Sequence, residues 1–115
     1  ARTTEDARRA ARTIADSLLT KTAMFGGDPN WGRILAALGR SGAEVDPDRV
    51  VLDLGGLVLF RSGSAEAYDL KSAEAAVAGP QIAVHIDLGL GAGRATVWTC
   101  DLSYDYVRIN AEYHT

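Results

Sequence analysis

The hydrophobic period changes once along the chain, and this change limits the fold more than any other feature. Near the start, apolar residues recur at three- and four-residue steps, which is the spacing of one face of a helix; they are Ala7, Ala10, Ala11, Ile14 and Leu18. After residue 49 they come in short alternating runs, which are typical of half-buried strands. The sequence therefore predicts helices first and a sheet afterwards.

Two helices are expected in the first half. Thr3 or Thr4 can cap the first helix, with acidic residues in the favourable first turn. Residues 17–27 show no clear period and end in two glycines. Asp28 followed by Pro29 is a helix-start signature, a cap and then a first-turn proline, and predicts the second helix behind it.

Four strands and two more helices are expected in the second half. Gly55–Gly56 predicts a hairpin between the first two strands, and Gly89–Gly93 predicts the turn between the last two. The expected strands are 49–54, 57–61, 81–88 and 94–100, and the expected helices are 70–78 and about 102–111. Hairpin-paired strands with helices on one face predict an α+β two-layer sandwich, which we assign to one domain over residues 1–115.

The composition argues against several classes of protein. The 115 residues are 47% hydrophobic, an ordinary value for a globular domain. A net charge of -3 argues against non-specific nucleic-acid binding, which needs a basic face. No stretch approaches the roughly 18 apolar residues of a membrane helix, and no apolar run follows the start as in a signal peptide. No membrane partner is expected, and the cytoplasm is the default setting.

Histidines and cysteine are too few to suggest a metal centre. Cys100 is the one cysteine, so an internal disulfide or a cysteine-rich zinc site is excluded. His85 and His114 are the only histidines, and the carboxylates show no spacing that favours a metal. No metal site is expected.

Four features could carry chemistry, and each has a structural explanation that we favour. A phosphate loop at Gly89–Gly93 would need a helix behind it, whereas a strand is predicted. Asp28, Asn30 and Arg33 could hold an anion at a helix start, but helix capping explains Asp28 without a ligand. The arginines of the first helix, which are Arg8, Arg9 and Arg12, read as a solvated face, and Trp31 reads as a core or interface anchor.

No residue has the surroundings of a convincing nucleophile. His85 lies in the middle of a predicted strand and is expected to be partly buried and hydrogen-bonded. Cys100 would need a nearby base to lower its pKa, so an inert buried thiol at a strand end is the better expectation. Lys21 is expected to be a surface charge or part of an interface.

The C-terminus allows two readings. Terminal residues usually fray, so a disordered tail is the simpler one. Alternatively, the hydroxyl and carboxylate of Thr115 could bind the ammonium group of an amino acid, and Asn110 offers both a donor and an acceptor. Physical chemistry permits the second reading but does not select it.

Three segments together resemble one family. They are Lys21–Ala23 leading into Asp28–Ile34 (DPNWGRI), Ala95–Leu102 (ATVWTCDL) and Tyr106–Ala111 (YVRINA). In order and spacing they are similar to the end of the β chain of the bifunctional glutamate/ornithine N-acetyltransferases, and the resemblance covers essentially all 115 residues. The departures are small; for example, Tyr104 stands where the family often has histidine.

The resemblance implies a fold, a reaction and a site. The fold would be part of an amidohydrolase-like enzyme with an N-terminal nucleophile, a threonine freed when the precursor cleaves itself. That threonine would take an acetyl group from N-acetylornithine and pass it to glutamate through an acyl-enzyme, with its own amine as base and an oxyanion hole for the intermediate. No cofactor or metal is implied, although acetyl-CoA serves some members as a co-substrate.

The resemblance also implies that this chain is incomplete as a catalyst. The nucleophile lies upstream in the family, so no catalytic residue is expected here, while the family's last substrate contacts fall on Asn110 and Thr115. The implied partners are an upstream α chain, the N-terminal part of the β chain and further copies in a hetero-oligomer. A relative acting in clavulanic acid synthesis is a same-fold alternative. A free-standing amino-acid-binding module and a purely structural remnant are the rivals from other classes.

Overall fold

The computed structural model describes residues 1–113, which form six helices and four strands. Three helices come first: α1 (Thr4–Ala15), α2 (Leu18–Phe25) and α3 (Trp31–Gly39). The remaining elements in chain order are the 3-10 helix η1 (Pro47–Arg49), strands β1 (Val51–Leu54), β2 (Leu57–Arg61) and β3 (Ser64–Ala65), helix α4 (Leu70–Ala76), strand β4 (Val84–Asp87) and helix α5 (Tyr104–Glu112). The predicted α+β class is confirmed.

The sheet is antiparallel throughout, with the strands in the order β3-β2-β1-β4. Gly55 and Gly56 both have positive φ, which the tight turn between β1 and β2 requires, so the predicted hairpin is confirmed. The β1–β2 register shifts between Leu52 and Asp53. Such a bulge lets two successive residues face the same side, and Leu59 and Phe60 are accordingly both buried.

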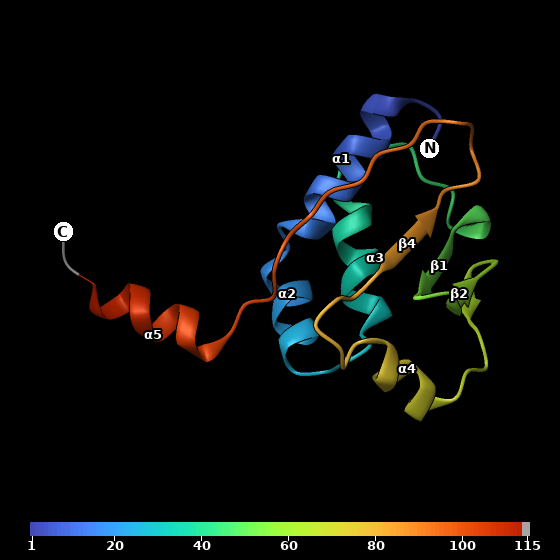
Figure 1. The fold of residues 1–115 in the computed structure, drawn as a ribbon. Helices are drawn as coiled ribbons and strands as arrows, with labels where there is room; N and C mark the ends of the chain where they lie inside the picture. Colours follow the sequence, from blue (N-terminus) through green and yellow to red (C-terminus); the bar gives the residue numbers. More distant parts are fainter. Residues whose placement is uncertain (114–115) are drawn as a thin grey trace.

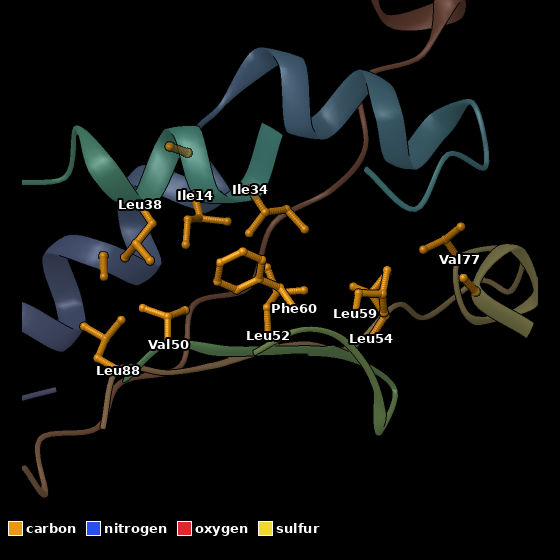
Figure 2. Packing of buried hydrophobic residues seen from close by; sticks show 13 residues of the cluster. Ile14, Ile34, Leu38, Val50, Leu52, Leu54, Leu59, Phe60, Val77 and Leu88 are labelled. Atoms are coloured by element: carbon orange, nitrogen blue, oxygen red, sulfur yellow. The ribbon is translucent and has the colours of Figure 1, made fainter. Parts of the chain in front are cut away.

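One hydrophobic core lies between the sheet and the helices (Figure 2). α1 and α3 pack against each other above the sheet. α4 contacts β2, and Val77 directly after α4 lies beside Leu54 and Leu59. The side chains of Ile34, Leu52 and Leu59 are fully buried at the centre. The ring of Trp31 lies 5.6 Å from that of Phe60, which confirms Trp31 as a core anchor. The arrangement is the predicted two-layer sandwich.

The first helix begins where the sequence predicts, and the next two correct the prediction. Thr3 caps α1 by accepting a hydrogen bond from the Asp6 amide. Residues 17–27 are not irregular, because Ser17 caps α2 by accepting from the Thr20 amide. Asn30, not Asp28, caps α3. Because α2 carries apolar residues on both faces, its sequence shows no clear helical period.

The chain leaves the sheet after β4, which corrects the prediction of a strand over 94–100. Gly93 and Ala1 exchange backbone hydrogen bonds, at 2.8 Å from the Gly93 amide and 2.9 Å to the Gly93 carbonyl. A Cβ on Gly93 would overlap the backbone of Thr3, so only glycine permits this approach. The glycines therefore do form a turn, but the turn delivers the chain to the N-terminus and across α1 rather than back along β4 (Figure 1).

Helix α5 projects away from the rest of the fold (Figure 1). Ser103 caps it by accepting from the Tyr106 amide, as the sequence allows. Each of its residues is exposed, including Tyr106, Val107 and Ile109. Within residues 1–113, no helix combines the length and apolar character needed to cross a membrane.

Replacing Gly93 by alanine should destabilise the chain by about 2 kcal/mol, because the added Cβ would force the Thr3 backbone away. Gly39→Ala is the matched control, since a Cβ at the end of α3 meets nothing within 4 Å. That control should be neutral or stabilising by up to about 1 kcal/mol. Urea unfolding measures both; equal stabilities for the two variants would contradict the proposed close approach.

The ion pair between Arg2 and Glu44 should make stability depend on pH in the acid range. Hydrogen bonds donated by Arg2, at 2.7–3.1 Å, hold the pKa of the Glu44 carboxyl below its ordinary value. A lowered folded pKa stabilises above the unfolded value of about 4.3, and the contribution is lost as the pH falls through the folded pKa. Glu44→Gln should therefore be less stable than the parent at pH 7, and the gap should close below about pH 4.

Both Glu44 and Arg2 are exposed, so the gap at pH 7 is expected to be small and to shrink with added salt. Glu74→Gln is the control, since no salt bridge within residues 1–113 involves Glu74. Chemical unfolding at a series of pH values provides the measurement. A gap for Glu44→Gln that stays constant from pH 7 to pH 3 would refute this account.

Candidate functional site

Two of the three segments that carry the family resemblance meet at one corner of the fold, and the third leaves the fold from there. α2 and the start of α3 contain the first segment, residues 95–102 run past them, and α5 carries the third. Figure 1 shows that the segment before α5, drawn in orange, runs along α1 and then past α2. The corner is therefore the candidate functional site.

Arg33 ties α3 to α2 at this corner. Its Nη1 donates to the Leu19 carbonyl at 3.0 Å and to Thr22 Oγ1 at 3.4 Å. Thr22 Oγ1 also donates to the same Leu19 carbonyl at 3.1 Å, so the three groups form a closed network. The network positions the end of α2, and Arg33 serves structure here rather than an isolated anion site.

Asp28 and Asn30 organise the loop between the two helices. Asn30 Oδ1 accepts from the Arg33 amide at 3.0 Å, and Asn30 Nδ2 donates to Asp28 Oδ2 at 3.1 Å. The structure thus brings the predicted group of Asp28, Asn30 and Arg33 together. Capping explains the group, although Asn30 rather than Asp28 provides the cap.

Residues 99–104 are attached to this corner by three contacts. Thr99 Oγ1 donates to the Ala15 carbonyl at 3.1 Å, and the Leu102 amide donates to the Lys21 carbonyl at 3.2 Å. The rings of Tyr104 and Phe25 then meet edge to face, with centroids 5.3 Å apart. These contacts fix the direction in which α5 leaves the fold.

Asn110 lies on α5, and its side chain is exposed. Its Nδ2 donates to the Tyr106 carbonyl at 2.8 Å, which leaves Oδ1 as an available acceptor. Thr115, the other predicted substrate contact, lies outside the described residues. The structure therefore places one of the two predicted contacts on a projecting helix, away from the α2–α3 network.

Two further expectations are changed by the structure. His85 is exposed rather than partly buried, although its Nδ1 does lie 3.0 Å from Asp53 Oδ2 as part of the predicted hydrogen bonding. Cys100 is exposed, not buried, because the segment that carries it is not a strand of the sheet. Among the described residues, no base is hydrogen-bonded to the Cys100 thiol, so the geometry does not mark Cys100 as a nucleophile.

The arginines of α1 are exposed, as predicted, but they do not stand alone. Arg8, Arg9 and Arg12 line an open groove of about 590 Å³ whose other wall is residues 94–97. Arg9 pairs with Glu5 at 2.6 Å, and Arg12 lies 4.0 Å from Asp16. The spacing of the arginines in the sequence predicts that they share an exposed face of α1. Their proximity to Arg94 depends on the tertiary fold and could not be predicted from that spacing.

Thr20 was missed by the sequence analysis. It is buried in α2, and its Oγ1 has no hydrogen-bond partner in the part of the chain that the structure describes. An unmet buried hydroxyl destabilises a fold. Nothing in the local sequence marks it, because residues 17–27 show no clear hydrophobic period from which a buried face could be predicted.

Within residues 1–113, no three His, Cys, Asp or Glu side chains are grouped so that they could hold a metal ion. The pair of His85 and Asp53 lacks a third ligand. The corner carries the hydrogen-bonded network of α2 and α3, and the acceptor Asn110 Oδ1 lies away from it on α5.

Comparison with known proteins finds one family. The family model described as the ArgJ family matches residues 1–115. The protein named Arginine biosynthesis bifunctional protein ArgJ from Symbiobacterium thermophilum is 50% identical over 115 residues, and Glutamate N-acetyltransferase from Methanosarcina mazei is 48% identical over 116 residues. A crystal structure of ArgJ from Bacillus halodurans superposes with a TM-score of 0.92 at 37% identity and covers 96% of this chain.

These relatives are much longer than the chain. The matched region is 29% of the Symbiobacterium protein and 29% of the Methanosarcina protein, against 100% and 96% of this chain. It is 53% of the Bacillus halodurans chain. The chain thus spans only part of the proteins it matches.

Replacing Thr20 by valine should stabilise the 115-residue chain by about 1 kcal/mol, because it removes an unmet hydroxyl without changing the volume much. Thr22→Val is the matched control in the same helix and should be destabilising, since that hydroxyl is hydrogen-bonded to Leu19. Urea unfolding of both variants gives the measurement. A loss of stability in Thr20→Val would mean that its hydroxyl is satisfied after all.

Proposed function

The chain belongs to the ArgJ family, and we propose that it is the C-terminal portion of an acetyltransferase of arginine biosynthesis. The proposed reaction moves an acetyl group from N-acetylornithine to glutamate. The observation that carries the proposal is a match along the whole chain, at 50% identity, to a region that is 29% of a longer relative named for arginine biosynthesis. A name such as Glutamate N-acetyltransferase among the relatives supports the glutamate half of the reaction.

The proposed chemistry is acyl transfer in two steps. A threonine hydroxyl outside these residues attacks the acetyl carbonyl of N-acetylornithine, forms an ester, and releases ornithine with the proton on its amine. The amine of glutamate then attacks the ester, which frees the threonine and gives N-acetylglutamate. No bound cofactor is needed for either step, and acetyl-CoA would be a second acetyl donor.

Four of the described hydroxyls are unsuited to act as the nucleophile, which supports the proposal that it lies elsewhere. Ser17 and Ser103 use Oγ as helix caps, and Thr22 is bonded to Leu19. Thr20 is buried, and its neighbours supply no base to take its proton. A hydroxyl nucleophile needs an adjacent base, so none of these four suits the role.

We propose that this chain supplies substrate contacts and packing surface. Asn110 is free to accept a hydrogen bond through Oδ1, and an ammonium or amide N–H of an amino acid is a suitable donor. Thr115 would complete the contact through its hydroxyl and carboxylate. The chain would act as one C-terminal domain, a proposal that its single hydrophobic core supports.

The proposed partners are the α chain and the N-terminal part of the β chain of the same enzyme, with further copies in a hetero-oligomer. The exposed apolar residues of α5 support a role in such an assembly. We place the enzyme in the cytoplasm, where Cys100 would persist as the exposed free thiol that the structure shows.

In the assembled enzyme, Asn110→Ala should raise the KM for N-acetylornithine and for glutamate. Loss of one hydrogen bond to a charged group is worth about 1.5–3 kcal/mol, which corresponds to a KM increase of about 10- to 140-fold. Steady-state acetyl transfer between the two substrates measures this effect, with kcat expected to change less than KM.

Asp105→Asn is the matched control on the same helix. It breaks only the exposed pair between Asp105 and Arg108, at 2.8 Å, and should leave both KM values unchanged. An assembled enzyme that transfers no acetyl group would refute the proposed reaction. Unchanged KM values in Asn110→Ala would refute the role of Asn110 alone.

A further inference from the structure

Residues 94–101 form an extended segment whose backbone is unpaired. Gly93 is the last residue bonded to Ala1, and the next backbone hydrogen bond in the chain is donated by Leu102. Between them, within the described part of the chain, the one hydrogen bond is donated by the side chain of Thr99 and involves no backbone group of residues 94–101. Backbone groups without protein partners are a template for pairing with another strand.

The segment also has the side-chain pattern of a strand. Ala95 and Val97 are half-buried, whereas Thr96 and Trp98 are exposed. The exposed fraction of Trp98 reaches 87%, the highest of the large apolar residues in the described structure. Alternation of this kind predicts a strand with one covered face. The exposed indole lies on the other face, which indicates that this face is covered by a part of the protein outside the described residues.

The groove beside the segment gives the partner a charge. Arg8 and Arg94 both line it, and no carboxylate within residues 1–113 lies within salt-bridge distance of either side chain. The neighbouring Arg9 and Arg12 are at least partly neutralised by Glu5 of α1 and by Asp16, which follows the helix. A strand that filled the groove would therefore be favoured by carboxylates on the side facing α1.

Helix α5, which follows the segment in the chain, also carries exposed apolar side chains. Tyr106 and Ile109 follow helical spacing and are 57% and 59% exposed, and Tyr113 directly after the helix is 68% exposed. The alignment with the Bacillus halodurans structure covers 96% of this chain, which leaves out about five residues, fewer than the nine of α5. At least part of this helix therefore has a counterpart in a chain of which the match is only 53%.

We propose that residues 94–101 are a strand of a second sheet, completed by a strand from the portion of the same enzyme that lies outside these 115 residues. The incoming strand bears carboxylates that meet Arg8 and Arg94, and the same portion covers Trp98. This inference rests on the proposed function, because it takes the missing partner from the rest of the ArgJ-family polypeptide. The occupant is that polypeptide because it makes up most of the length of the relatives.

Hydrogen exchange followed by mass spectrometry tests the pairing. In the whole enzyme, amides of residues 94–101 should exchange at least 100-fold more slowly than those of the 115-residue chain alone. The amides of Leu52 and Leu54, which lie in the central strand, should be protected in both samples and report that each is folded. Equal exchange of residues 94–101 in both samples would overturn the proposal.

A second set of variants tests the arginines within the whole enzyme. Arg8→Ala combined with Arg94→Ala should speed exchange at residues 94–101 by at least tenfold, whereas Arg40→Ala, on the exposed end of α3, should not. Protection that appears in the isolated chain as its concentration rises would identify a second copy as the occupant and overturn the assignment. Acetyl transfer by the same samples is a separate readout. An active enzyme in which residues 94–101 are unprotected would refute only the proposed strand pairing. An inactive enzyme in which these residues are protected would refute only the proposed reaction.

Discussion

The close approach of Gly93 to the backbone of Thr3 decides where residues 94–113 lie. A side chain at residue 93 has no space there, and the exchange of hydrogen bonds with Ala1 holds the chain in place. Once the chain is held at the N-terminus of α1, it cannot turn back along β4. It must cross α1 instead, so the sheet ends at four strands and the last helix leaves the fold at α2.

This single constraint divides the molecule into two parts with different physical character. The body has a closed core in which Ile34, Leu52 and Leu59 are fully buried (Figure 2), and its helices are capped by their own side chains. The arm over residues 94–113 has the opposite balance, because the backbone of residues 94–101 is unpaired, Trp98 is exposed and every residue of α5 is exposed. A body stabilised by its own packing can present an arm whose backbone groups and apolar side chains find partners only in another part of the polypeptide. Assembly of a larger enzyme would require such an arm.

The sequence could predict whatever depends on local pattern. The β1–β2 hairpin follows from Gly55–Gly56 between two apolar runs, and the caps of α1, α4 and α5 follow from short polar side chains before helical spacing. The path of residues 94–100 could not be predicted, because an alternating pattern indicates that a segment pairs as a strand but does not indicate which strand is its partner. The exposure of Cys100 follows from the same error. For the site, the family resemblance pointed to Asn110, whereas the network of Arg33 with α2 depends on a contact fourteen residues apart in sequence that no local rule contains.

The central claim is that these residues are one part of an acetyltransferase and cannot act alone. The most direct test is acetyl transfer from N-acetylornithine to glutamate, measured for the 115-residue chain, for the remaining polypeptide and for the two assembled together. The account predicts transfer by the assembled enzyme and none by the chain alone. Transfer by the chain alone, or an assembled enzyme that leaves glutamate unacetylated, would contradict it.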